Sequence, residues 1–132
     1  MNVRDFEGWL AGVLGAQPWA GQVERWSTGN GPRPVGLTLA GRVHLQLVGG
    51  DQKAAPLDPN DAGVVPAVEA SPSDPAGWAE AITRTVVEAG MPRVKSAETY
   101  AAWGGSTKPG GMRVVFVDGS ELFASIIDSG RR

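Results

Sequence analysis

The chain has 132 residues, of which 42% are hydrophobic and 20% charged, so it is long and apolar enough to fold as one domain, 1–132. It has no cysteine and one histidine, His44, which excludes disulfides, thiolate metal sites and cysteine nucleophiles and argues against a histidine-based metal site or catalytic triad. A formal net charge of −2 argues against binding of nucleic acid through its phosphates.

The amino-terminal residues do not have the pattern of a targeting segment. Asp5 and Glu7 stand where a secretory signal would carry basic residues. The longest strand-like apolar run, Val114 to Val117, is far shorter than the ~20 residues that a membrane-spanning helix needs. We therefore expect a cytoplasmic or virion-associated protein without a membrane partner.

Apolar residues at helical spacing from Val3 to Leu14 predict an amphipathic helix that begins after Asn2, a good N-cap, and ends at Gly15. A short strand is expected within 22–27, followed by the turn-rich run 29–34.

The next segment predicts a hairpin with one apolar face. A three-residue turn, Ala40-Gly41-Arg42, would pair Leu39 with Val43. One long strand bent at Gly41 satisfies the same parity and is the alternative. In both cases the apolar residues at odd positions share a face because side chains alternate along a strand: Val35, Leu37, Leu39, Val43, Leu45 and Leu47.

Residues 49–73 form a proline-rich connection in which 64–68 could add a short edge strand. The spacing of Asp58, Asn60, Gly63 and Glu69 resembles that of a calcium-binding loop. Because Ala62 occupies a ligand position, a chance match is the better interpretation, and calcium binding within 58–69 remains the alternative. We predict no metal and no cofactor.

A second helix is expected from Asp74-Pro75 to the left-handed stop at Gly90. Residues 93–100 then favour a strand, with a short helix from Ser96 as the alternative. The loop 104–111 is rich in glycine but lacks the residue order of a phosphate-binding P-loop.

A second hairpin, 112–117 and 121–127, follows with the turn Asp118-Gly119-Ser120. Because the turn has an odd number of residues, one face gathers Met112, Val114, Phe116, Leu122, Ala124 and Ile126.

Both parts of the chain thus predict the same order, a helix and then three strands. We expect an α+β fold of two α-β-β-β halves, 1–48 and 74–128, joined by 49–73. Half a chain could scarcely bury its own helix face, so the halves should share one core. The simplest arrangement is a largely antiparallel sheet with both helices packed on one face.

The stretches from Trp26 to Leu47 and from Tyr100 to Ile127 each place proline and glycine before a strand–turn–strand. In this they resemble small, uncharacterised two-repeat α+β proteins of high-GC Gram-positive bacteria, often carried by phages and mobile elements. The resemblance implies neither an activity nor catalytic residues.

Five tryptophans against one tyrosine is an unusual balance. Trp9 and Trp78 fit the buried stripes of the two helices. The other three lie in or beside loops, where tryptophan often anchors an interface, although core packing explains each equally well. Together with the loop cation, they are the predicted partner-binding residues: Trp19, Trp26, Trp103 and Lys108.

We therefore predict a non-enzymatic protein-interaction or structural component, of a phage or mobile element, that binds a protein partner or itself through loop aromatics and hairpin edges. No catalytic residue is predicted. The alternative is a small enzyme or ligand-binding domain that uses His44 and carboxylates in a cleft between the halves. It would be favoured by a structure that places His44 within hydrogen-bond reach of Glu24 or Glu98 in a pocket.

Overall fold

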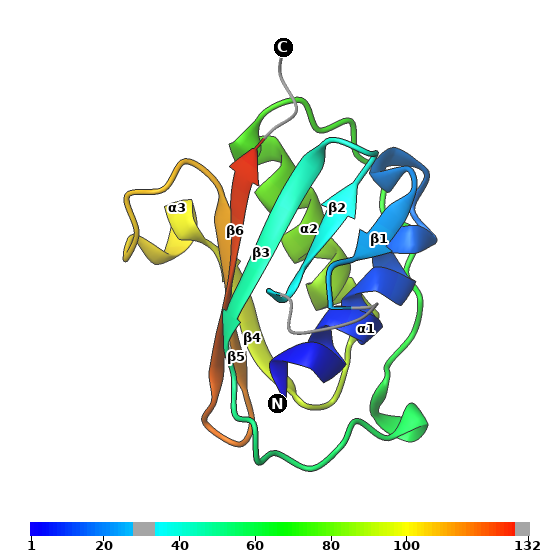
Figure 1. Cartoon of the computed structure of the whole chain (residues 1–132), viewed down its shortest axis with the longest axis vertical. Coiled ribbons are helices and arrows are strands. Elements are labelled where there is room, and N and C mark those ends of the chain that lie inside the picture. The colour runs from blue at the N-terminus through cyan, green and yellow to red at the C-terminus, as the bar shows by residue number, and fades with distance from the viewer. Residues whose placement is uncertain (28–33, 129–132) are drawn as a thin grey trace.

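The computed structural model describes residues 1–27 and 34–128, so nearly all of the predicted turn-rich run 29–34 lies outside the described residues. The elements form a helix and three strands, followed by a second helix and three strands (Figure 1). They are α1 (Val3–Gly15), β1 (Val23–Arg25), β2 (Gly36–Leu39), β3 (Val43–Gly49), α2 (Pro75–Ala89), β4 (Val94–Thr99), β5 (Gly111–Phe116) and β6 (Glu121–Asp128). Three short helices complete the list: η1 (Pro18–Ala20), η2 (Pro59–Asp61) and α3 (Tyr100–Trp103).

The six strands form one antiparallel sheet in the order β1-β2-β3-β6-β5-β4. The β3–β6 pair at its centre joins the two parts of the chain. All four hairpin strands are paired on both sides, so the free edges belong to β1 and β4. The prediction of docking through hairpin edges is therefore wrong.

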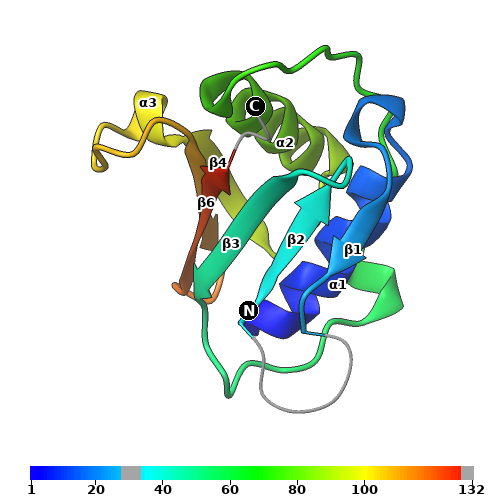
Figure 2. The same cartoon turned by 45° about the horizontal axis from the view of Figure 1, so that its top comes forward.

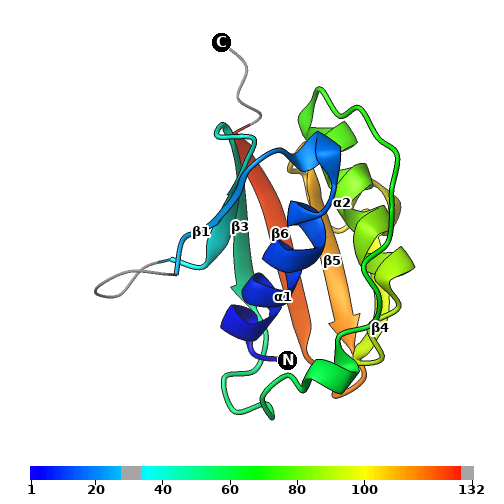
Figure 3. The same cartoon turned by 90° about the vertical axis from the view of Figure 1, so that its right-hand side faces the viewer.

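Both long helices lie on the same face of this sheet, as Figure 3 shows, where α1 and α2 lie in front of β5 and β6. Helix α1 contacts β1, β2 and β3, and α2 contacts β4, β5 and β6. Figure 2 shows the β1–β2–β3 part lying over α1. The α+β class, the antiparallel sheet and the placement of the helices are confirmed.

The helix ends follow the predicted capping chemistry. The Asn2 side chain accepts hydrogen bonds from the amides of Arg4 and Asp5, and Asp74 accepts one from Gly77 at 2.7 Å. Gly90 ends α2 in the left-handed conformation, with φ of 63°.

The first hairpin has the predicted three-residue turn, which pairs Leu39 with Val43 and Leu37 with Leu45, so the alternative of one bent strand is wrong. Apart from half-buried Val35, the predicted apolar faces of both hairpins are buried and pack on the helices. The rings of Phe6 and Phe116, from opposite parts of the chain, meet edge to face at 5.5 Å. The two parts therefore share one interior.

The second hairpin differs from the prediction in register. Val114 pairs with Leu122, so the turn is Val117-Asp118-Gly119 and not Asp118-Gly119-Ser120. The Asp118 carboxylate accepts the amide hydrogen of Ser120 at 2.8 Å, and Gly119 takes a φ of 90° to close the turn. The displacement is two residues, so the predicted apolar face is unchanged.

The edge strand that 64–68 could have added is absent, whereas the strand expected within 93–100 is confirmed. Residues 64–68 form no strand, because the Val68 backbone bonds to side chains and not to a neighbouring strand. Residues 94–99 are a strand, which excludes a helix from Ser96. The helical turn α3 follows instead, where the Thr99 hydroxyl accepts the amide hydrogen of Ala102.

Candidate functional site

Because both long helices cover one face of the sheet, the opposite face carries the alternate side chains of every strand. We call this the outer face; Figure 1 shows it in front of α2, with α3 standing out beside β6. Val48 and Ile127 are exposed there, at 48% and 55%. The central strands place six side chains on the outer face: His44, Gln46, Val48, Phe123, Ser125 and Ile127.

A cluster of aromatic rings lies where α3 meets β6. The ring of Trp103 is 5.6 Å from that of Phe123 and 6.0 Å from that of Tyr100. The guanidinium of Arg113 lies 5.2 Å from the centre of the Trp103 ring, within cation–π range. The ring of Trp103 is therefore held in place by contacts with three neighbouring side chains.

Arg113 is itself held in place by two carboxylates. Its guanidinium lies 2.6 Å from Glu121 and 3.0 Å from Glu98. The hydrogen bond to Glu121, and then that to Glu98, raise the pKa of Arg113 above its ordinary value. The Arg113 guanidinium is therefore already paired with two carboxylates, and its contact with the Trp103 ring holds that ring in place.

Beside the rings lies a hollow of about 270 Å³, the outer-face hollow, which brings together two of the predicted residues, Trp103 and Lys108. The Lys108 Nζ is 3.4 Å from the Ser125 hydroxyl. Buried Ser125 shares a second hydrogen bond, of 2.8 Å, with the Tyr100 hydroxyl. The lining is Val48, Tyr100, Trp103, Gly105, Ser106, Lys108, Phe123 and Ser125.

Trp26 lies on the same face but over β2, two strands away from β6. Its Nε1 donates to the Thr38 hydroxyl at 2.9 Å, and its ring is 6.1 Å from His44. A Cβ on Gly36 would come within 2.5 Å of the Trp26 ring. The ring thus covers the backbone of β2, and the structure does not bring it into the hollow.

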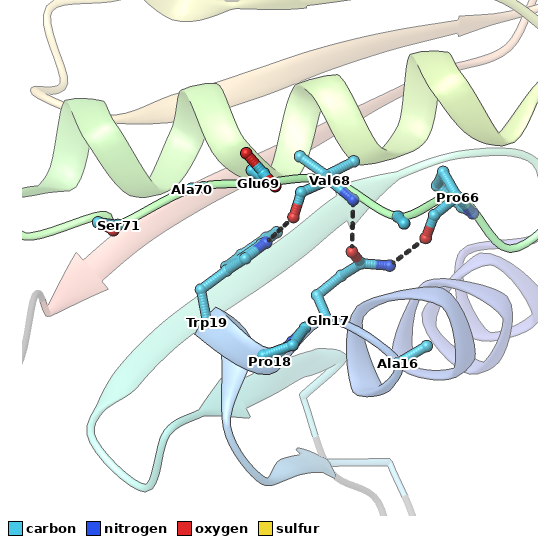
Figure 4. Close-up of a pocket in the computed structure, with 10 residues that line it drawn as sticks. Ala16, Gln17, Pro18, Trp19, Pro66, Val68, Glu69, Ala70 and Ser71 are labelled. Atoms are coloured by element: carbon cyan, nitrogen blue, oxygen red, sulfur yellow. Dashed lines mark hydrogen bonds between the residues drawn. The ribbon is translucent and has the colours of Figure 1, made fainter.

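Trp19 lies away from the outer face, against α2 and the extended segment 66–71. Its ring is 6.0 Å from that of Trp78, and its Nε1 donates to the carbonyl of Val68 at 2.8 Å. Gln17 donates to the carbonyl of Pro66 at 2.7 Å and accepts the amide hydrogen of Val68 at 2.9 Å (Figure 4).

Residues 16–19 and 66–71 line a second hollow, of about 490 Å³. The indole nitrogen of Trp19 and both amide atoms of Gln17 are engaged with backbone, so they hold the segment 66–68 in place. We therefore assign Trp19 a packing role.

The groups that an enzymatic site would need are paired elsewhere. His44 Nδ1 is 3.1 Å from the Thr38 hydroxyl, Glu24 accepts from Gln22, and Glu98 is bound by Arg113. Strand β4, which carries Glu98, is three strands from His44 on β3, or about 14 Å at the spacing of strands in a sheet. Within the described residues, then, His44 and Glu98 do not form a catalytic pair.

The segment 58–69, whose spacing resembles a calcium-binding loop, makes local hydrogen bonds. The Asp58 carboxylate accepts the amide hydrogen of Asn60 at 2.8 Å and caps η2. Among residues 1–27 and 34–128, there is no group of three or more histidine, aspartate or glutamate side chains arranged to hold a metal ion.

In comparisons with protein-family models, curated proteins and solved structures, nothing matches this chain. Within the described part of the chain, none of the helices has the length and apolar content of a membrane-spanning segment. The chemistry of the outer face has to be inferred from its own residues.

Of the residues that line the outer-face hollow, only Trp103 and Lys108 were predicted from the sequence. The sequence did contain a signal for two of the others. Val48 and Phe123 are apolar residues at strand positions whose neighbours, Leu47 and Leu122, already face the core. Val48 and Phe123 pair across β3 and β6, so together they begin an apolar patch on the face opposite the core. Tyr100 and Ser125 gave no such signal, because their pairing depends on the register of three strands.

Proposed function

We propose that this protein is a non-enzymatic interaction component that docks a protein partner through its outer face. A single observation carries the proposal: both long helices pack on one face of the sheet, and the other face leaves Val48 exposed beside an aromatic cluster. Exposed apolar surface of this kind marks interaction sites, and tryptophan, tyrosine and arginine dominate the binding energy at such sites.

The rigidity of the cluster supports the proposal. Trp103 is fixed by Arg113, Tyr100 and Phe123, so little rotamer freedom remains to be lost on docking. The polar side chains among them, Lys108 and Ser125, supply the directional contacts that make docking specific.

The edges of the sheet are weaker candidates. Strand β1 has only three residues, and β4 has a register irregularity near exposed Lys95. Short, irregular and charged edges resist the addition of another strand. We therefore assign docking to the face of the sheet.

We also infer that 1–48 and 74–128 are equivalent units joined by 49–73. In each, a strand begins with a glycine beneath the ring of the residue that directly follows the preceding strand: Gly36 beneath Trp26, after β1, and Gly111 beneath Tyr100, after β4. Origin in a phage or mobile element rests on the sequence resemblance alone.

The proposal is tested by placing a photo-crosslinking amino acid at Val48, on the outer face, in cells that produce the protein. Val87, which is exposed on α2, is the matched control at 56% exposure. We expect a discrete protein adduct from position 48, which includes an adduct of twice the chain's mass if the partner is a second copy, and none from position 87. No adduct from position 48, or equal adducts from both, would overturn the proposal.

A further inference from the structure

We propose that the outer-face hollow takes the carboxyl-terminal residue of a partner chain, with its free carboxylate against Lys108 and Ser125 and its apolar side chain against Trp103 and Phe123. The inference rests on the proposed function and specifies its chemistry.

Charge complementarity provides the first argument. Lys108 has no carboxylate within ion-pair distance among the described residues, and its ammonium group contacts only the Ser125 hydroxyl, at 3.4 Å. Nearby Arg113 is already bound by two carboxylates. An ammonium group has three donors, so Lys108 retains hydrogen-bonding capacity for an anion at the hollow.

The buried hydroxyl pair provides the second argument. Tyr100 and Ser125 share one hydrogen bond, of 2.8 Å, in which either oxygen can donate. Whichever hydroxyl donates within the pair, the other retains its own proton for a second acceptor. A carboxylate oxygen beside Lys108 would accept that proton and would therefore have two donors of different kinds.

The apolar walls and the size of the hollow identify what accompanies the carboxylate. Trp103, Phe123 and Val48 offer aromatic and aliphatic surface next to Lys108. A volume of about 270 Å³ lies below the roughly 300–1,000 Å³ of common ligand pockets and suits a single residue.

These features favour a chain terminus over an internal acidic side chain. A terminal apolar residue carries its carboxylate and its apolar group on the same α-carbon, so both fit one small hollow. An internal aspartate or glutamate would need a second residue to contact Trp103 and Phe123. Capture of a terminal carboxylate is an established mode of peptide recognition.

The test is an NMR titration of the labelled full chain with two probes, N-acetyl-phenylalanine and its primary amide, which differ only in that the first carries a carboxylate and the second a neutral carboxamide. We expect the acid to shift the resonances of Trp103, Phe123 and Ser125, with an affinity at least tenfold greater than that of the amide. Lys108→Met should abolish this difference, whereas Lys95→Met, an exposed lysine on β4, should leave it unchanged.

Equal affinity for acid and amide would overturn the carboxylate inference while leaving docking through the outer face intact. If neither probe shifts the resonances of the residues that line the hollow, the inference is overturned as well. The proposed function would then be decided separately by whether position 48 crosslinks, so the two failures are distinguishable.

Discussion

Glu7 is a charged residue within the apolar stripe of α1, and it is fully buried. Its carboxylate accepts hydrogen bonds from the Arg25 guanidinium at 2.8 Å, the Gly36 amide at 2.9 Å and the Ser27 hydroxyl. A buried carboxylate is tolerated only when it is paired and hydrogen-bonded in this way. Glu7 thereby fixes the end of β1 and the start of β2 to the first helix.

Glu7→Leu should lower the free energy of unfolding by about 3 kcal/mol, because it leaves the buried Gly36 amide without its acceptor and removes one of the acceptors of Arg25. Urea denaturation followed by tryptophan fluorescence measures the change. Glu80→Leu, at an exposed position of α2, is the control and should change stability by less than about 0.5 kcal/mol. Equal effects of the two variants would show that the network is not stabilising.

Asp118 interacts with the amino group of Met1, which lies 2.7 Å from its carboxylate. That hydrogen bond, followed by those from Ser120, holds the pKa of Asp118 well below its ordinary value of 3.8. A carboxyl group whose pKa is lowered by folding stabilises the protein above its unfolded pKa. This stabilisation is lost as the pH falls from about 4 toward the lowered value.

Asp118→Asn should therefore cost about 0.5–1 kcal/mol at pH 7, a small value because the carboxylate is 39% exposed. The difference from the unsubstituted protein should shrink at pH 3. Urea denaturation at both pH values measures it, and a difference that is the same at pH 3 and pH 7 would contradict the ion-pair account.

At the scale of elements, β5 depends on a glycine beneath an aromatic ring. A Cβ on Gly111 would come within 2.1 Å of the Tyr100 ring, so this residue has to lack a side chain for α3 to approach the sheet. The same contact places the Tyr100 hydroxyl on Ser125 and shapes the outer-face hollow.

Gly111→Ala should lower stability by roughly 2 kcal/mol through overpacking and should weaken binding of N-acetyl-phenylalanine. Thermal denaturation and the NMR titration measure the two effects. The control is Gly12→Ala on α1, where a Cβ would contact nothing within 4 Å and the substitution should stabilise the helix. If Gly111→Ala is as stable as Gly12→Ala, Tyr100 does not pack as described.

The elements that follow local rules could be predicted from the sequence. Asn2, Asp74 and Gly90 bound the two long helices through capping chemistry encoded within a few residues of each end. The alternation of apolar residues fixed which side of each hairpin faces the core.

The elements that depend on tertiary contacts could not be predicted. The turn of the second hairpin is accompanied by a contact between Asp118 and the amino group of Met1, 117 residues away in the chain. The segment 66–68 is held by Gln17 and Trp19 across 49 to 51 residues. The hollow likewise needs the β4–β5–β6 register to bring Tyr100 onto Ser125.

At the scale of the whole molecule, α1 packs on β1–β3 and α2 packs on β4–β6. Because β3 and β6 pair at the centre of the sheet, the two parts of the chain enclose one hydrophobic core. Because both long helices pack on the other face, the described residues that cover the outer face are its own strand side chains, α3, the loop that carries Lys108, and Trp26. We propose that this asymmetry separates two roles: one face of the sheet stabilises the fold, and the other is available to a partner.

Because the chain has no cysteine, single-cysteine variants test this account directly. The measurement is the rate of maleimide labelling of Val48→Cys and Val87→Cys, in cells that produce the protein and again after purification and dilution. Both positions should react at similar rates in the diluted chain, and position 48 alone should be protected in cells, by tenfold or more. Equal reactivity of the two positions in cells would contradict docking through the outer face.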